Sequence, residues 1–294
     1  MAHSPRPLTS REFKIMLQTK HFTNKMKGIK EISSLIGSIV EKQGGKFKAS
    51  DKYKEEERTT WFLDTKAYEL YRDKKFLLRI RESKVSGLYE VTLKCRHPDR
   101  YVCALYDLSV AQDMETKFKD EIKTKFEEDI VTSKMTDGSA TSVSKFSLSA
   151  TFEDSKKPNF DKIKNLIAFF PDLELEGIAP NELLARVNDF EAKEISSKIG
   201  TITFSGDDTE IEPELNLWYS TNEEKPLIVE FTFKCKAAKQ NNDKDKDKGV
   251  LLEKYSKKLV LGASHLYESL QKDTNIIDLD TTRTKTDFVY LVKK

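Results

Sequence analysis

The fold of this chain is decided by residues 58–96, RTTWFLDTKAYELYRDKKFLLRIRESKVSGLYEVTLKCR. Two segments of this stretch alternate charged or polar with apolar side chains at a period of two, as β-strands do. In the first segment, FLLRIRES, Arg79 and Arg81 share one face and apolar residues share the other. In the second, LYEVTLKCR, Lys94 lies on the polar face, and Gly87 marks the turn between the segments. The stretch therefore predicts a β-hairpin with one apolar face and one face of fixed cations.

The cationic face of this hairpin has two interpretations. It is either the solvated outer face of an antiparallel sheet or a binding surface for an anion. Arginines two residues apart suit phosphate oxygens, because each guanidinium is planar, remains charged and offers several N–H donors. A single hairpin fits both interpretations, so the decision depends on whether other strands repeat the pattern.

Composition narrows the class of protein. The 294 residues are 37% apolar and 34% charged with a net charge of +2, so overall charge indicates neither nucleic acid nor a membrane as a partner. The three cysteines form no CxxC pair, which favours a reducing compartment, and the scattered histidines predict no zinc site. No apolar leader or apolar run of membrane-spanning length is present. We therefore expect a cytoplasmic protein without a membrane segment.

Five segments along the chain carry charged side chains on one strand face. The charged positions are Glu12, Lys14, Arg79, Arg81, Lys94, Lys125, Glu127, Asp129, Glu230 and Lys234. If these faces point at one another, the strands close into a barrel with a charged interior and an apolar exterior. Such an interior is costly unless its charges are paired or a ligand compensates them. The excess of cations favours a polyanion bound together with a divalent cation.

Amphipathic helices are available to cover the apolar exterior of such a barrel. Apolar residues recur at helical spacing over 26–40 and again over 252–270. The remaining predictions are short helices over 159–170 and 181–190, strands over 101–110 and 283–294, and a loop over 132–144. The predicted fold class is α+β, with a closed antiparallel β-barrel or tunnel that has a charged interior and is flanked by amphipathic helices.

With these motifs in this order, the chain resembles the CYTH superfamily, also called triphosphate tunnel metalloenzymes. The family's ExExK, DT, LRxR, TLK and carboxylate strands correspond here to SREFK, LDT, LRIR, VTLK, KFEED and VEFTF, which begin at residues 10, 63, 78, 91, 125 and 229. The resemblance implies an eight-stranded antiparallel tunnel that binds triphosphate and hydrolyses its terminal phosphate with Mg²⁺ or Mn²⁺. It further implies a single domain over 1–294, with insertions near 132–192 and a flexible loop at 238–249.

The resemblance also implies roles for individual residues. The phosphates would be bound by Lys14, Arg79, Arg81, Lys94, Lys125 and, in a less regular strand, Lys198. The metal would be held by Glu12, Glu127, Asp129 and Glu230, and the first three would also act in catalysis. Hard carboxylate oxygens of this kind are the ligands that magnesium prefers.

Two positions depart from the family pattern and leave two hypotheses open. Ser10 and Thr232 stand where the family has carboxylates. The chain is therefore either a metal-dependent triphosphatase or a non-catalytic binder of polyphosphate or nucleotide. The substrate also stays open among inorganic triphosphate, thiamine triphosphate, a nucleoside triphosphate and a 5′-triphosphate RNA end. That RNA end is the only nucleic acid we expect as a partner, and the oligomeric state does not follow from the sequence.

Overall fold

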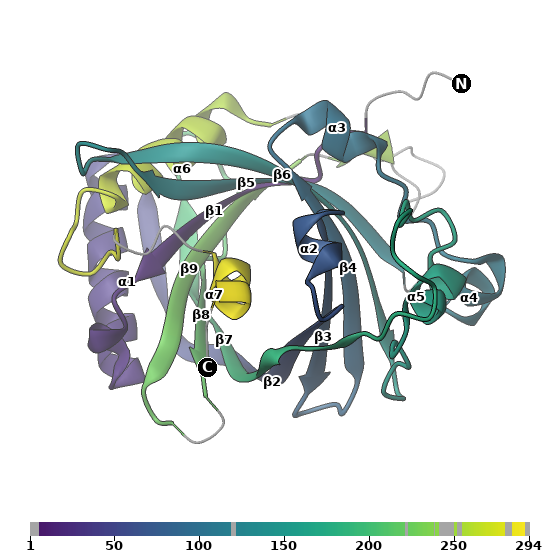
Figure 1. Cartoon of the computed structure of the whole chain (residues 1–294). Helices are drawn as coiled ribbons and strands as arrows, with labels where there is room; N and C mark the ends of the chain where they lie inside the picture. Colours follow the sequence, from purple (N-terminus) through teal and green to yellow (C-terminus); the bar gives the residue numbers. More distant parts are fainter. Residues whose placement is uncertain are drawn as a thin grey trace.

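The computed structural model describes residues 6–118, 122–220, 223–237, 239–240, 250–251, 255–279 and 284–291. In this part of the chain one sheet closes on itself in the strand order β1-β5-β6-β4-β3-β2-β7-β8-β9 (Figure 1). Its strands are β1 Ser10–Leu17, β2 Lys46–Asp64, β3 Phe76–Ser83, β4 Tyr89–His97, β5 Lys123–Lys134, β6 Ala140–Asp154, β7 Ala185–Thr203, β8 Glu214–Tyr219 and β9 Pro226–Lys236. The short pair β10 Lys239–Gln240 and β11 Val250–Leu251 lies apart from this sheet. The predicted α+β architecture with a closed sheet is confirmed.

The direction of one strand pair differs from the prediction. Eight of the nine pairs in the closed sheet are antiparallel, but β1 and β5 run parallel, with Glu12 in register with Asp129. The expectation of an eight-stranded, wholly antiparallel barrel is therefore wrong for the described residues. Parallel partners need a long connection, and here more than 100 residues separate β1 from β5 along the chain. The parallel pair closes the ring and brings charged residues of both strands to the same place.

The apolar side chains of the strands lie on the outside of the barrel, where helices cover them. The helices are α1 Lys25–Lys42, α2 Glu69–Arg72, α3 Arg100–Leu105, α4 Gln112–Lys117, α5 Ile163–Phe169, α6 Lys257–Leu270 and α7 Lys285–Leu291, with a 3₁₀ turn at Thr19–Phe22. The predicted long helices are confirmed as α1 and α6, and their buried apolar residues pack with those of β1 and β9. A second cluster joins α3 and α5 to β3, β4 and β6. None of the helices in the described residues is long and apolar enough to cross a membrane.

Five predicted elements differ from those observed. Residues 101–110 were expected to form a strand, but most of α3 lies there, because the Asp99 carboxylate accepts hydrogen bonds from the amides of Tyr101 and Val102 and so begins the helix. The predicted loop at 132–144 is largely the end of β5 and the start of β6. The predicted helix at 159–170 is shorter, since α5 covers only Ile163–Phe169.

The other incorrect predictions involve the pairing of β7 and the chain end. Residues 181–190 were predicted as a helix, but the chain enters β7 at Ala185 and pairs with β2. A short segment of mixed polar and apolar residues fits the helical period of 3.6 and the strand period of 2 equally well, and pairing with a neighbouring strand then decides its structure. The predicted C-terminal strand at 283–294 contains α7 in its described part. Most of the loop predicted at 238–249 lies outside the described residues.

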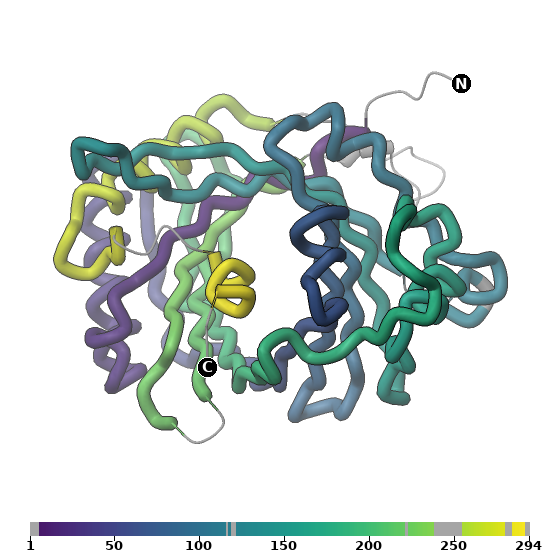
Figure 2. The backbone as a smooth tube through the Cα atoms, viewed as in Figure 1, coloured from purple at the N-terminus to yellow at the C-terminus, as the bar shows by residue number. Residues whose placement is uncertain are grey.

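Two short helices, α2 and α7, lie at one mouth of the barrel, where Figures 1 and 2 show α7 nearly end-on within the ring. The buried Asp64 of the LDT motif joins them. Its Oδ1 accepts hydrogen bonds from the amides of Thr65 and Leu70 at 2.7 and 3.0 Å. Its Oδ2 accepts from the Tyr71 amide at 3.1 Å and from the Tyr290 hydroxyl at 2.9 Å. The motif aspartate therefore begins α2 and anchors α7.

Replacement of Asp64 should cost more stability than replacement of its partner on α7. Asp64→Ala leaves several buried N–H groups without an acceptor, at a cost on the order of 3 kcal/mol or more, whereas Tyr290→Phe removes one hydrogen bond worth about 1 kcal/mol. Urea denaturation of both variants and the wild type measures the difference. Equal stability of Asp64→Ala and the wild type would contradict the anchoring role.

Candidate functional site

The barrel encloses a cavity of about 720 Å³, lined by residues from all nine strands and by the start of α7. Thirteen lysines and arginines and nine aspartates and glutamates are among the described residues that line it. The charged strand faces therefore point into the barrel, and the interpretation of the hairpin as a solvated outer face is wrong. The cavity brings together all ten predicted site residues, namely Glu12, Lys14, Arg79, Arg81, Lys94, Lys125, Glu127, Asp129, Lys198 and Glu230.

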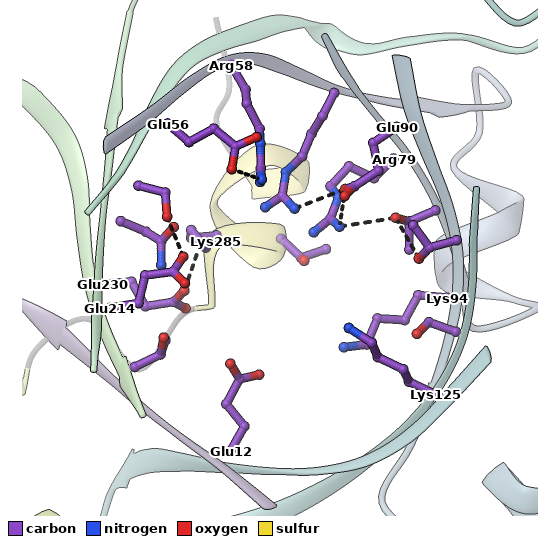
Figure 3. Close-up of a pocket in the computed structure, with 18 of the residues that line it drawn as sticks. Glu12, Glu56, Arg58, Arg79, Glu90, Lys94, Lys125, Glu214, Glu230 and Lys285 are labelled. Atoms are coloured by element: carbon purple, nitrogen blue, oxygen red, sulfur yellow. Dashed lines mark hydrogen bonds and ion pairs between the residues drawn. The ribbon is translucent and has the colours of Figure 1, made fainter. Parts of the chain in front are cut away.

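Two groups of like charge face each other across this cavity, and each group also has partners of the opposite sign (Figure 3). We call Arg79, Lys94 and Lys125, from β3, β4 and β5, the cationic wall. Glu214 and Glu230, from β8 and β9, form the acidic wall. An anion is attracted to one wall and a cation to the other, so the cavity suits a ligand that contains both.

Asp129 is the most strongly neutralised carboxylate in the cavity. It is 2% exposed, with Lys14 Nζ at 2.9 Å from Oδ1 and with Lys94 Nζ and Arg96 Nη2 at 3.5 and 3.6 Å from Oδ2. Burial alone would raise the pKa of Asp129, but these cations outweigh burial and hold the pKa well below its usual range. Asp129 is therefore ionised and holds three cations at the lumen.

Two further carboxylates from the predicted set have comparable surroundings. Glu12 lies 3.0 Å from Lys14 Nζ and 3.4 Å from Lys234 Nζ, and these lysines lower its pKa to about 2 against the opposing effect of burial. Glu127 accepts a hydrogen bond from the Ser10 hydroxyl at 2.7 Å and lies 3.8 Å from Lys234. Ser10, which stands where the family pattern has a carboxylate, thus orients the carboxylate of Glu127.

The two arginines of the central hairpin have different surroundings. Arg81 donates to both oxygens of Glu194 at 2.8 and 3.0 Å, and Glu194 is fully buried. Arg79 makes only longer contacts, at 3.3 Å to Glu90 and 3.2 Å to Thr92, and its buried Nε has no hydrogen-bond partner among the described residues. Arg81 is therefore committed to an internal ion pair, whereas Arg79 retains a donor for a ligand.

Several charged residues of the lumen were not predicted from the sequence. Arg96 and Glu194 were recognisable, because each lies two residues from a polar residue of the same strand face. Glu214 is in register with Thr232, so the acidic wall has two carboxylates although Thr232 is not one. The side chain of Lys198, which was predicted to bind phosphate, is 42% exposed and pairs with Glu212 at 2.6 Å. Among the predicted site residues that form ion pairs, Lys198 is the most exposed.

The described residues contain no group of three or more histidine, cysteine, aspartate or glutamate side chains placed to hold a metal ion. Each predicted carboxylate ligand instead contacts a lysine. Magnesium, however, usually keeps several waters and binds through one or two carboxylates together with substrate phosphates. The donor chemistry therefore fits Mg²⁺ or Mn²⁺ that is bound by one or two carboxylates together with waters and a phosphate chain.

Because the two arginines have different surroundings, replacing Arg79 should affect ligand binding and replacing Arg81 should affect stability. If the lumen binds triphosphate, Arg79→Met should weaken that binding by about 1.5–3 kcal/mol, the value of a charge-assisted hydrogen bond, with little change in stability. Arg81→Met should lower the free energy of unfolding by about 3–5 kcal/mol, because it removes the guanidinium that pairs with both oxygens of the buried Glu194. Calorimetric titration and urea denaturation measure these effects. Unchanged affinity in the first variant, or unchanged stability in the second, would contradict the assignment.

If the lumen binds triphosphate, as the sequence predicts, binding should be accompanied by proton uptake at Lys94. Burial lowers the pKa of Lys94 to about 8, against the opposing charge of Asp129 and with added repulsion from Lys14 and Arg96. A phosphate beside Lys94 would favour its charged form, so affinity should fall as the pH rises above about 8. Without ligand, the free energy of unfolding should rise between about pH 8 and 10.5, because the unfolded chain there keeps a proton that the folded protein has lost.

Calorimetry in buffers of different ionisation enthalpy measures this proton uptake. About half a proton should be taken up per triphosphate bound at pH 8. The matched control is Lys94→Arg, which keeps the positive charge but does not titrate in this range. The same proton uptake in the arginine variant would assign the titration to another group.

No protein-family model and no curated protein matches this chain. Among solved structures, HpAC1 from Hippeastrum, described as having a dominant triphosphatase activity, is similar with 13% identity and a TM-score of 0.35 over 76% of this chain and 78% of that chain. A candidate adenylate cyclase from Bacillus halodurans shows 14% identity and a TM-score of 0.33 over 78% and 81% of the two chains. PH1012 from Pyrococcus horikoshii shows 10% identity and a TM-score of 0.34 over 97% and 99%. Similarity at this level establishes neither the family nor the function of the chain.

Proposed function

We propose that the barrel binds the phosphate chain of a triphosphate-bearing substrate and hydrolyses its terminal phosphate with Mg²⁺ or Mn²⁺. The observation that carries this proposal is the separation of the cationic wall from the acidic wall within one cavity. Phosphates would face the cationic wall, and carboxylates that line the cavity would hold the divalent cation. On this proposal the chain, residues 1–294, is one divergent CYTH-like tunnel domain.

The cations of the lumen would bind and neutralise the phosphates. Arg79 has a buried donor to offer, Lys125 lines the cavity with an exposed side chain, and Lys94 gains its proton most readily beside an anion. Lys14 would contribute through the same group of charges around Asp129. In phosphoryl transfer such fixed cations stabilise the charge that develops on the transferred group. Arg81 would act indirectly, because its ion pair with Glu194 holds the strand that carries Arg79.

The carboxylates would hold the divalent ion and orient water. Glu12, Glu127, Asp129 and Glu230 are the candidate ligands, and Glu214 lies near Glu230. When bound, the ion would supply Lewis-acid activation of the phosphate. Glu127 is suited to accept a proton from an attacking water, because its carboxylate lines the cavity and the Ser10 hydroxyl fixes its orientation.

A second candidate function is binding of polyphosphate or nucleotide without turnover. It is favoured by one observation, that each predicted metal ligand contacts a lysine ammonium. Such a lumen could hold a polyanion with no metal present. A binder of this kind would be stabilised by triphosphate by about 2.7 kcal/mol at one hundred times the dissociation constant and would release no phosphate.

Phosphate release from a panel of substrates distinguishes the two functions. The panel contains inorganic triphosphate, thiamine triphosphate, nucleoside triphosphates and a 5′-triphosphate RNA, each with Mg²⁺, with Mn²⁺ and with chelator. We expect metal-dependent release from at least one of them. Glu127→Gln should reduce kcat by about 10²-fold or more, because general-base catalysis commonly contributes that much, while triphosphate binding persists.

The matched control is Glu128→Gln on the same strand. Glu128 points to the other face of β5, where it pairs with Arg11 at 3.0 Å and does not line the cavity. This variant should retain the wild-type kcat. Thermal stabilisation by triphosphate with no phosphate release from any substrate under either metal would support the binding function and contradict hydrolysis.

A further inference from the structure

One cation of the lumen comes from the C-terminal helix and lies against the acidic wall. Lys285, the first residue of α7, places Nζ 2.7 Å from Glu230 Oε1, and the two side chains are only 16% and 7% exposed (Figure 3). The same ammonium lies 5.5 Å from the ring centroid of Trp218. Its charge also helps Arg81 to lower the pKa of Glu194, against the effect of burial. Lys285 thus neutralises carboxylates of two strands.

The position of Lys285 is fixed by contacts elsewhere on α7. The Tyr290 hydroxyl binds the buried Asp64, and the carbonyl of Val289 accepts a hydrogen bond from Asn188 Nδ2 at 2.8 Å. Tyr290 also stacks on Tyr71, with ring centroids 4.0 Å apart. These contacts belong to the fold and involve no ligand. The contacts of α7 with the barrel therefore hold the Lys285 ammonium at the acidic wall.

Lys285 and a divalent ion compete for the charge of Glu230. The carboxylate needs a counter-charge because it is buried, and the ammonium already lies at hydrogen-bond distance from one of its oxygens. A divalent ion bound to the same carboxylate would lie within a few ångströms of the ammonium, where like charges repel strongly in a poorly solvated cavity. Occupation by one cation therefore weakens binding of the other.

We propose that Lys285 is a tethered cation that occupies the divalent-metal position at Glu230. The metal binds there only after Lys285 has left, so the docking of α7 sets the affinity of the free protein for the metal. This inference rests on the proposed function, because it takes Glu230 as a metal ligand. It assigns to Lys285 a role that was not predicted from the sequence, namely to determine whether an ammonium or a metal ion lies at Glu230.

Binding of Mn²⁺ to the metal-free full chain, followed by electron paramagnetic resonance without triphosphate, tests this inference. Lys285→Met should bind Mn²⁺ roughly tenfold more tightly than the wild type, or better, because a competing charge is removed. Lys285→Arg keeps the charge and should bind as weakly as the wild type. The control Lys30→Met removes an exposed lysine from α1 and should also leave Mn²⁺ affinity unchanged. The gain of Lys285→Met should disappear in the double variant with Glu230→Gln.

Unchanged Mn²⁺ affinity in Lys285→Met, or a gain that persists with Glu230→Gln, would overturn the inference. A second measurement needs no change at Lys285 and covers the case in which that variant does not fold. In Trp61→Phe protein, Trp218 is the only tryptophan, so its emission should change as saturating Mg²⁺ displaces the ammonium from its ring. Constant emission at saturation would also overturn the inference. Neither measurement involves phosphate release, so failure of hydrolysis and failure of this inference are distinguishable.

Discussion

The buried carboxylate of Asp129 requires cations from two other strands, and much of the barrel depends on that requirement. Lys14 reaches it from β1, and Lys94 and Arg96 reach it from β4. Each of these charges would be expensive in a closed lumen without the others. The pair of Arg81 and Glu194 makes the same connection between β3 and β7. Closure of the sheet and neutralisation of the lumen are therefore a single constraint, because a strand that moved away would leave a charge unpaired.

This constraint inverts the usual distribution of residues in a small barrel. With the charges inside, the apolar residues of the strands lie outside, and α1 and α6 on one side and α3 and α5 on the other must cover them. The lumen then keeps a cavity of about 720 Å³ lined with charged side chains. The last helix, α7, is an exception, since it lies at one mouth and contributes its own cation to the acidic wall. The fold thus provides a cavity with separated charges whose acidic wall is already partly neutralised.

The sequence predicted those strands whose charged and apolar side chains alternate along the chain. The hairpin of Arg79, Arg81 and Lys94 was recognisable because strand side chains alternate strictly, and α1 because its apolar stripe is long. The parallel pairing of β1 with β5 could not be predicted, because pairing between segments far apart in the sequence leaves no local pattern. Lys285 was missed because its short segment fits a strand and a helix equally, and only docking on Asp64 decides. Glu214 has a role only through its position beside Thr232, which the chain order does not reveal.

The most direct test of the account is a crystal structure of the full chain with a non-hydrolysable triphosphate analogue such as imidotriphosphate. The account predicts the phosphate chain inside the barrel, with its oxygens in contact with Arg79, Lys94 and Lys125 and with the acidic wall on the far side. A triphosphate analogue bound only on the outer surface, with the lumen unchanged, would contradict it.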